Sequence, residues 1–323
     1  MSGFLKIYIF FVILCVLLAG ILSWILFPQL HPDSTVIQIP LPTFLARTFN
    51  NQVTTLDIWE PVQSFIAQAL GSSLPVSAKS ALSYDLTTNT PLFELDPKVK
   101  LPMASLTKIM TAVIALEHPK PDDQYIVRGD ALVGEDSMGL SEGEILDLQD
   151  LLYGLILHSG NDAAEVLAEN FPGGRGQFID AMNKKAVALG LTNTHFTNPT
   201  GLEGDGSQYT TAYDLLTLTR YALETFPAFD DVAAAATYTI SQTQTHKEYD
   251  LENETNLLTT YPGVKGVKTG YTPEAGLCLV TYLDYKGHKI IAIVLGSEDR
   301  RDDMKEILDY SLQKLHVTPP HHG

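Results

Sequence analysis

Three short groups of residues along the chain could together carry out chemistry. They are Ser105-Leu-Thr-Lys108, Ser159-Gly-Asn161 and Lys268-Thr-Gly270. A serine hydroxyl is a weak nucleophile unless a neighbouring base removes its proton, and a neutral lysine amine can be that base. A single Ser-x-x-Lys arises by chance in a chain of this length, as Ser311-Leu-Gln-Lys314 shows. The three groups together, in this order, predict a site that forms an acyl-enzyme on a serine.

The sequence around the first group predicts an amphipathic helix. Beyond Pro102, apolar residues recur at helical spacing. These residues are Leu106, Ile109, Met110, Val113 and Leu116. Ser105 is therefore expected in the first turn of this helix. Because residues three apart on a helix share a face, the Lys108 amine would lie within reach of the Ser105 hydroxyl.

The second group lies between two apolar segments with helical character, at residues 148–157 and 163–167. Ser159 and Asn161 are expected in a tight turn that caps the second of these helices. Taken alone, this group favours an ordinary helix N-cap, since Ser and Asn prefer such positions whatever the function of a protein. The second group indicates a catalytic role because it occurs together with the other two groups.

The third group lies in a region with the patterns of β-strands. Lys268 and Thr269 fall on an outer strand, where such polar residues ordinarily form a solvated edge. A turn at residues 285–288 joins two of the predicted antiparallel strands. The segments with strand patterns are residues 78–84, 91–95, 264–269, 277–283 and 289–295.

The composition limits the classes of function. With 323 residues, of which 45% are hydrophobic and 18% charged, the chain can form one large domain or two closely packed subdomains. The net charge of −17 and the lack of a long basic run argue against a nucleic-acid partner, whose phosphates require clustered Lys and Arg. The histidines form no metal-binding spacing, so no metal or other cofactor is expected. Cys15 lies in an N-terminal apolar run, which leaves Cys278 without a partner in the domain.

The N-terminus carries a candidate membrane anchor. Residues 7–27 contain no charged side chain, and as a helix they would span roughly 30 Å, the thickness of a bilayer core. A cleaved signal peptide is the alternative, but its apolar region is usually shorter, about 7–15 residues. Lys6 precedes the run and the next cation is Arg47, so residues 1–6 are expected in the cytoplasm. The protein would then be a single-pass protein of the cell membrane, with the rest of the chain outside.

Beyond the anchor the chain is predicted to have three parts. Residues 28–76 begin with several prolines and are expected to form a stem or linker. Residues 77–316 are expected to form the catalytic domain, and residues 317–323 a tail. Asn198-Pro-Thr-Gly201 predicts a turn that serves as scaffold rather than as part of the site. Asn253-Glu-Thr255 matches a glycosylation acceptor, but the pattern is too common to carry weight.

From about Ser77 to Leu315 the chain resembles the D-alanyl-D-alanine carboxypeptidase family, the low-molecular-mass penicillin-binding proteins of bacterial wall metabolism. This resemblance implies an α/β fold of the β-lactamase/transpeptidase type, with a five-stranded antiparallel sheet flanked by helices, a helical subdomain, and the site between them. The N-terminal transmembrane helix is expected to replace a C-terminal membrane anchor that many members carry. The similar segments are Pro102-Met-Ala-Ser-Leu-Thr-Lys-Ile-Met-Thr111, Leu151-Leu-Tyr-Gly154, Ser159-Gly-Asn-Asp-Ala-Ala164, Asn198-Pro-Thr-Gly-Leu202 and Gly266-Val-Lys-Thr-Gly-Tyr-Thr272.

The resemblance also implies a mechanism. Ser105 would attack the carbonyl between the two terminal D-alanines of a peptidoglycan stem peptide, forming an acyl-enzyme and releasing D-alanine. Lys108 would take the serine proton, Ser159 would relay a proton to the leaving amine, and Asn161 would orient the lysine and the substrate. The oxyanion would lie between the backbone N–H groups of Ser105 and Tyr271. Water would then free the shortened peptide, and β-lactam antibiotics would acylate the same serine as inhibitors.

The same resemblance assigns substrate binding to the third group. Lys268 with Thr269 would hold the terminal carboxylate of the stem peptide. Arg300 or Arg301 is expected to add a contact to that carboxylate. The substrate-binding residues are expected to be Lys268, Thr269, Gly270 and Tyr271.

Three other functions stay open. An endopeptidase that cuts peptidoglycan cross-links would use the same residues and differ in what the cleft admits beyond the scissile bond. A class A β-lactamase would need a deacylating glutamate in a Glu-x-x-Leu-Asn loop, and no such segment occurs between Asn161 and Lys268. A membrane-anchored wall-binding protein with an inactive site is the non-enzymatic alternative.

Overall fold

The structure is a computed structural model that describes residues 59–61, 74–204 and 206–322. The predicted cytoplasmic N-terminus, the predicted anchor and most of the predicted stem lie outside the described residues. Within the described ranges, no helix is both long enough and apolar enough to cross a bilayer. The division into anchor, stem, catalytic domain and tail therefore stays a prediction.

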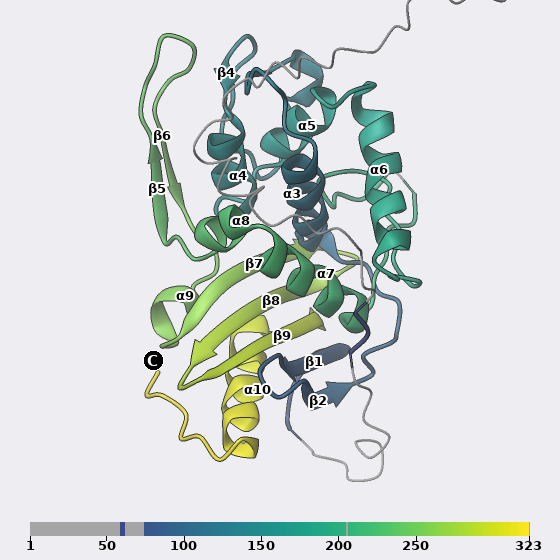
Figure 1. Ribbon diagram of the computed structural model, residues 1–323, viewed down its shortest axis with the longest axis vertical. Helices are drawn as coiled ribbons and strands as arrows, with labels where there is room; N and C mark the ends of the chain where they lie inside the picture. Colours follow the sequence, from purple (N-terminus) through teal and green to yellow (C-terminus); the bar gives the residue numbers. More distant parts are fainter. Residues whose placement is uncertain (1–58, 62–73, 205, 323) are drawn as a thin grey trace, which may run out of the picture. The chain divides into compact units, whose positions relative to one another are not determined.

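A five-stranded sheet forms the centre of the described chain (Figure 1). All neighbouring strands run antiparallel. Lys286 and Gly287, with φ of 47° and 87°, make the tight turn between the last two strands. The predicted five-stranded antiparallel sheet is confirmed. In the order β2-β1-β9-β8-β7, the strands are Thr90–Leu95, Ser80–Asp85, His288–Ser297, Gly276–Tyr285 and Val264–Thr272.

The central strand β9 has an uninterrupted apolar run because both of its faces are covered. Successive residues of a strand point to opposite faces, so each face receives every second side chain. Ile291, Ile293 and Leu295 pack into the core on the side of most helices. The alternate residues Ile290, Ala292 and Val294 pack into a second core, on the side of the C-terminal helix.

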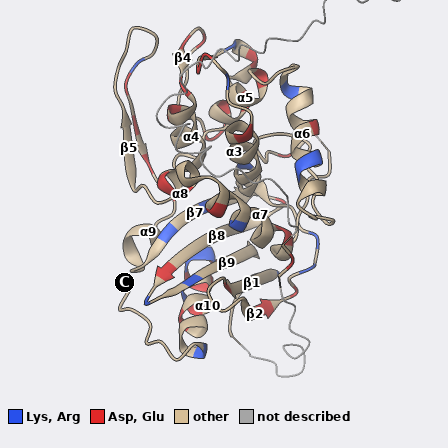
Figure 2. Ribbon diagram, in the orientation of Figure 1, with Lys and Arg blue, Asp and Glu red and all other residues tan. Residues whose placement is uncertain are grey.

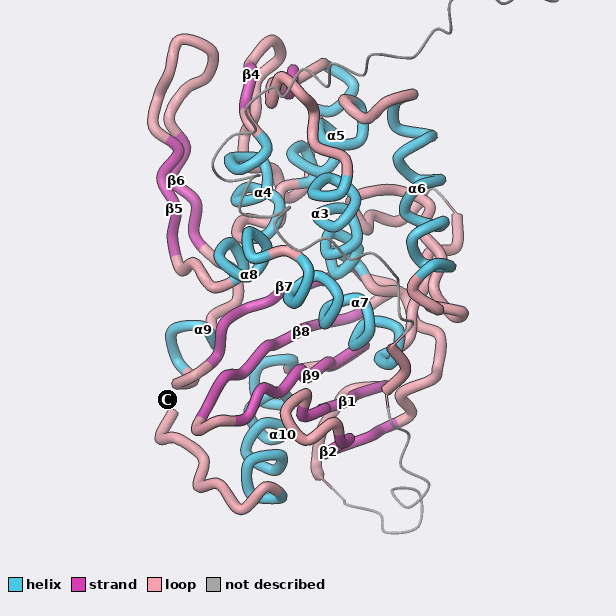
Figure 3. The backbone as a smooth tube through the Cα atoms, in the orientation of Figure 1, coloured by secondary structure: helices cyan, strands magenta, loops and turns pink. Residues whose placement is uncertain are grey.

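Helices lie on both faces of the sheet (Figures 1 and 3). Helix α10 (Arg300–Lys314) covers one face, where it contacts β1, β2, β8 and β9. On the other face, α7 (Ala212–Thr225) packs against β1, β9 and α3, and α8 (Pro227–Ala233) packs against β7. The helical subdomain consists of α3 (Lys108–Glu117), α4 (Leu148–Ile156), α5 (Asn161–Glu169) and α6 (Gly174–Ala188).

Shorter elements complete the described chain. Two hairpins lie apart from the main sheet, β3 (Tyr125–Ile126) with β4 (Ile145–Leu146) and β5 (Thr237–Ile240) with β6 (Tyr249–Glu252). The remaining short elements are the 3₁₀ turns η1 (Ala104–Thr107) and η2 (Gly129–Ala131) and the short helix α9 (Leu257–Thr260).

Ser105 lies in a 3₁₀ turn, and the prediction that it occupies the first turn of an α-helix is wrong in this detail. The backbone N–H of Leu106 donates to the carbonyl of Met103, three residues back, at 3.1 Å. This bond is typical of a 3₁₀ turn, and the α-helix begins only at Lys108. Ser105 and Lys108 still share a face, because side chains three apart eclipse each other in this turn.

The edge strand β7 lies directly against the turn that carries Ser105, and Gly270 makes this approach possible. A Cβ atom at position 270 would lie 3.1 Å from the backbone N of Ser105 and 3.2 Å from both the Cβ of Ala104 and the carbonyl O of Met103. A larger residue there would have to push these atoms away by a few tenths of an ångström. The glycine of the third group thus favours the close approach of β7 to the turn that carries Ser105.

We expect Gly270→Val to lower the free energy of unfolding by about 1–3 kcal/mol, because a larger side chain there forces the strand away from the turn. Urea denaturation followed by circular dichroism measures this change. Gly134→Val is the matched control, since a Cβ atom there meets no other atom within 4 Å. Equal destabilisation by the two variants would contradict the close approach.

Candidate active site

The amine of Lys108 is the centre of a buried polar cluster. Its Nζ lies 2.8 Å from Ser105 Oγ, 2.6 Å from Asn161 Oδ1 and 2.7 Å from the carbonyl O of Thr200. The lysine side chain is fully buried. The structure therefore brings Ser105 and Lys108 together with Asn161 and the Thr200 carbonyl, from η1, α3, α5 and the loop before α7.

Burial holds the pKa of Lys108 well below its ordinary value of 10.5. The main cause is loss of water around the ammonium form, and the positive charge of Lys268 acts in the same direction. Asp136, Glu254 and Asp162 raise the pKa, but their effects are smaller. The fold thus favours the neutral amine.

A neutral amine fits the three neighbours of Lys108 Nζ. It carries two N–H donors and one lone pair. Asn161 Oδ1 and the Thr200 carbonyl can only accept hydrogen bonds, so they take the two N–H groups. The orientation of the Asn161 amide follows from its Nδ2, which donates to the Glu135 carbonyl at 2.6 Å. The lone pair is left for Ser105, whose O–H can donate to it, and this is the geometry of a general base.

Asn161 does not act as the helix cap that its sequence position suggests. It is the first residue of α5, and Gly160 occupies the N-cap without a side-chain hydrogen bond. The Asn161 amide is already used on Lys108 and on the Glu135 carbonyl. The ordinary-cap interpretation of the second group is therefore wrong for this residue.

Ser159 occupies a tight turn just before α5 and is 2% exposed. Its φ of 58° is left-handed, which strains a non-glycine residue by roughly 1–3 kcal/mol. Two backbone bonds hold the turn, from Gly160 N to Gly154 O at 2.9 Å and from Asn161 N to Asp136 O at 2.7 Å. Strain of this kind is typical of functional sites.

The same strain recurs beside the nucleophile. Ala104, directly before Ser105, has a φ of 47°. Both serines of the predicted site therefore lie next to, or at, a left-handed non-glycine residue. The surrounding structure must fix both turns firmly for this backbone geometry to persist.

Asp162 is a supporting residue that the sequence reasoning did not single out. Its buried carboxylate accepts from Ser137 Oγ at 2.5 Å and from the backbone N–H groups of Met138, Gly139 and Leu140 at 3.0 Å each. These bonds hold the loop whose carbonyls bind Asn161. The sequence offered one indication of this role, because Asp162 is a charged residue that directly follows the second group.

The turn at residues 198–201 forms as predicted, but its role was predicted wrongly. Asn198 Oδ1 accepts from the backbone N–H of Gly201 at 2.7 Å and of Thr200 at 3.2 Å. This Asx turn aims the Thr200 carbonyl at Lys108. The turn is therefore part of the site and not scaffold alone. A backbone carbonyl has no sequence signature, so the pattern could not reveal this contact.

Lys268 and Thr269 are buried although they lie on an edge strand. Lys268 is 1% exposed and Thr269 3% exposed, so the solvated-edge interpretation is wrong here. The Thr269 hydroxyl donates to Glu254 Oε2 at 2.9 Å, and the same oxygen lies 4.0 Å from Lys268 Nζ. Glu254 is a second residue of the site that the sequence reasoning missed.

The ammonium of Lys268 has unused donors. No atom of the described residues accepts a hydrogen bond from its Nζ. Burial lowers the pKa of Lys268 to about 8, against the opposing effect of the Glu254 carboxylate. A buried cation with free N–H groups is suited to bind an anion that enters the site.

Arg300 braces the strand that carries the third group. Its Nη1 donates to the carbonyl of Gly270 at 2.8 Å, whereas the backbone N–H of Arg301 donates to Asp299 at the start of α10. Tyr271, the next residue of β7, is 59% exposed. A contact from either arginine to a substrate carboxylate stays a prediction.

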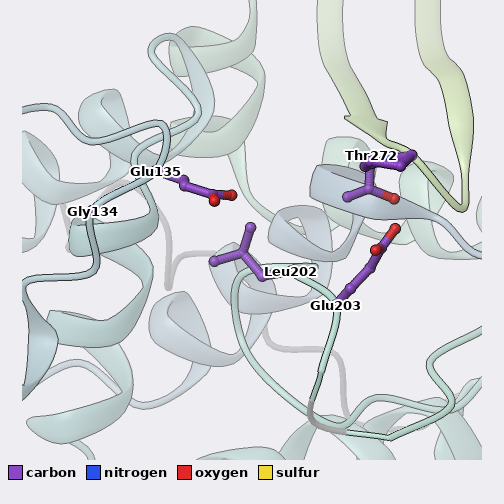
Figure 4. A pocket seen from close by; sticks show the side chains of 6 residues that line it. Gly134, Glu135, Leu202, Glu203 and Thr272 are labelled. Carbon is purple, nitrogen blue, oxygen red and sulfur yellow. The ribbon is translucent and has the colours of Figure 1, made fainter.

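An open pocket of about 480 Å³ adjoins the cluster (Figure 4). Glu135 enters it from one side and Glu203 from the other, with the Glu203 side chain directed toward Thr272. Bonds from the Thr272 hydroxyl and the Glu274 backbone N–H lower the pKa of the Glu203 carboxyl. The pocket is lined by Gly134, Glu135, Leu202, Glu203, Thr272 and Pro273.

The described residues contain no cluster of metal ligands, and their basic residues are interspersed with acidic ones along the ribbon. No group of His, Cys, Asp or Glu in residues 59–61, 74–204 and 206–322 could hold a metal ion. Figure 2 shows Lys and Arg on several helices and strands, interspersed with Asp and Glu.

Comparison with known proteins places the chain in a family. A family model described as D-alanyl-D-alanine carboxypeptidase matches residues 66–299. D-alanyl-D-alanine carboxypeptidase DacF of Bacillus subtilis is 34% identical, over 77% of this chain and 65% of its own, so the chain spans just under two thirds of that relative. The D-alanyl-D-alanine endopeptidase of Pseudomonas aeruginosa is 32% identical, over 69% of this chain and 72% of its own.

A solved structure agrees. The Streptomyces K15 DD-transpeptidase has a TM-score of 0.69 and 31% sequence identity, over 74% of this chain and 98% of its own. The fold is therefore that of the transpeptidase-like enzymes. Together with the match over residues 66–299, this shows that the chain belongs to the D-alanyl-D-alanine carboxypeptidase family.

Proposed function

We propose that the protein is a serine-type D,D-carboxypeptidase that removes the terminal D-alanine from peptidoglycan stem peptides through an acyl-enzyme. The observation that carries the proposal is the 2.8 Å contact between Ser105 Oγ and the buried amine of Lys108. The activity named for the Bacillus subtilis relative supports it.

In the acylation step, Ser105 Oγ attacks the carbonyl carbon between the two D-alanines. The serine proton passes to the lone pair of Lys108 as the new C–O bond forms. The backbone N–H groups of Ser105 and Tyr271 stabilise the oxyanion of the tetrahedral intermediate. The C–N bond then breaks, and the leaving amine receives a proton through Ser159, so that free D-alanine departs.

In the deacylation step, water attacks the ester carbonyl of the acyl-enzyme. A base takes one proton from the water, and Ser105 Oγ regains a proton as the ester bond breaks. The products are the shortened stem peptide, with a new carboxylate, and the free enzyme. Asn161 and the Thr200 carbonyl keep the Lys108 amine in place through both steps.

Substrate recognition uses Lys268, the second buried lysine of the site. Lys268 acts in its protonated form, whereas Lys108 acts as a neutral amine. The Lys268 ammonium and the Thr269 hydroxyl hold the terminal carboxylate of the peptide. The positive charge of Lys268 also lowers the pKa of Lys108, so the carboxylate site and the base are electrostatically linked. Penicillins carry a carboxylate beside their reactive amide, and the same two groups would hold it while Ser105 opens the ring.

A cross-link endopeptidase is the second candidate. The Pseudomonas aeruginosa relative, which is 32% identical, is named a D-alanyl-D-alanine endopeptidase. Such an enzyme uses the same acylation chemistry and differs in the group beyond the scissile bond. Release of D-alanine from monomeric pentapeptide, compared with cleavage of cross-linked dimers, distinguishes the two.

With the predicted anchor at residues 7–27, the site would face the wall on the outer side of the membrane.

We expect Ser105→Ala to lower D-alanine release from a pentapeptide that ends in D-alanyl-D-alanine by at least about 10³-fold, because the nucleophile is lost. Labelling by a fluorescent penicillin should disappear as well. Ser207→Ala, at an exposed serine, is the control and should leave both unchanged. Persistent labelling of a folded Ser105→Ala protein would rule out this serine as nucleophile.

We expect a bell-shaped dependence of kcat/KM on pH. The rate rises with pH as Lys108 becomes neutral, at a pH well below 10.5. It falls again near pH 8, because Lys268 loses the proton that lets it bind a carboxylate. Lys268→Arg keeps a positive charge at all these pH values, so the alkaline limb should move upward even if the rate is lower. An alkaline limb at the same pH in this variant would show that another group controls it.

A further inference from the structure

Glu254 places a carboxylate at the position proposed for the substrate carboxylate. Its Oε2 accepts a hydrogen bond from Thr269 Oγ1 at 2.9 Å and lies 4.0 Å from Lys268 Nζ. These are the two groups to which the proposed function assigns carboxylate binding. The site therefore already contains an anion that belongs to the protein.

The backbone around Glu254 is fixed by hydrogen bonds. The Glu254 N–H donates to the Leu157 carbonyl at 3.1 Å. Asn253 Nδ2 donates to the Ala235 carbonyl at 2.9 Å, and Asn253 Oδ1 accepts from the Thr255 N–H at 2.9 Å. The amide of the apparent glycosylation pattern is thus used inside the fold, where it positions Glu254.

The side chain of Glu254 can leave the site without disturbing this backbone. It is 40% exposed, so rotation about its own bonds would carry the carboxylate into water. Lys268, at 1% exposure, cannot follow it. Lys268 therefore remains buried in the site, where its positive charge is stabilised if another anion binds beside it.

Several charges act on Lys268. Glu254 and Asp136 raise its pKa, whereas burial and Arg300 lower it. The Lys108 amine is electrostatically linked to Lys268 in the same cluster. Of the charged groups around Lys268, Glu254 has the largest effect on its pKa. The carboxylate therefore helps to keep Lys268 protonated before substrate binds.

Two carboxylates cannot both accept the hydrogen bond of the Thr269 hydroxyl. The Thr269 hydroxyl has one hydrogen, and Glu254 already accepts it. A second carboxylate beside the first would also be repelled by it. We propose that Glu254 is a resident counter-ion that the carboxylate of the substrate displaces, which makes it a specificity-determining residue for the carboxylate. This inference rests on the proposed function of the site.

Glu254→Gln tests the exchange, because it removes the charge and keeps the shape of the side chain. At pH 6, where Lys268 is protonated, we expect acylation by a fluorescent penicillin to be faster by on the order of tenfold, since a charge-assisted bond no longer competes. With the pentapeptide, the gain should appear as a lower KM at unchanged kcat. The alkaline limb of the pH profile should move to lower pH, because the carboxylate no longer raises the pKa of Lys268.

Glu252→Gln is the matched control, since it changes the charge equally at an exposed position of β6 two residues away. This control variant should have the same acylation rate, the same KM for the pentapeptide and the same alkaline limb of the pH profile as the wild type. Glu254→Ala is a second variant that should act in the same direction if the glutamine variant folds poorly. Acylation at pH 6 that is no faster in the folded Glu254 variants would overturn the exchange. If the fluorescent penicillin does not label the wild-type protein at all, the proposed function itself is refuted.

Discussion

The burial of one amine, that of Lys108, determines how the site works. An ammonium without water is unfavourable, so the fold favours the neutral form with its lone pair. Two acceptors, Asn161 Oδ1 and the Thr200 carbonyl, hold its N–H groups. Because these partners come from α5 and from the loop before α7, segments that are far apart in the sequence must meet at Lys108. The close approach of Gly270 to the serine turn completes this arrangement.

Much of the sheet follows from local pattern. The pattern of residues 289–295 predicts a strand, and the corresponding strand β9 lies at the centre of the sheet. Turn residues 285–288 mark the hairpin that joins it to β8. The pairing of Ser105 with Lys108 was predictable too, because three-residue spacing brings side chains together in any helical turn.

The parts that could not be predicted depend on contacts between distant segments. Glu254 reaches Thr269 only because a loop after β6 folds back onto β7, and a single glutamate carries no pattern. The Thr200 carbonyl belongs to the backbone, so the residue type at this position does not indicate its contact with Lys108. Lys268 is buried although it lies on the edge strand β7, which contacts η1, α8 and α9, whereas edge-strand rules alone predict exposure.

The most direct test is the protonation state of Lys108 in the folded protein. NMR of protein labelled with ¹³C at lysine Cε can follow it, with the signal assigned by its loss in Lys108→Met. The account predicts an amine that is neutral at the pH of activity and becomes protonated well below 10.5. A Lys108 signal that titrates near its ordinary value of 10.5 would contradict the account.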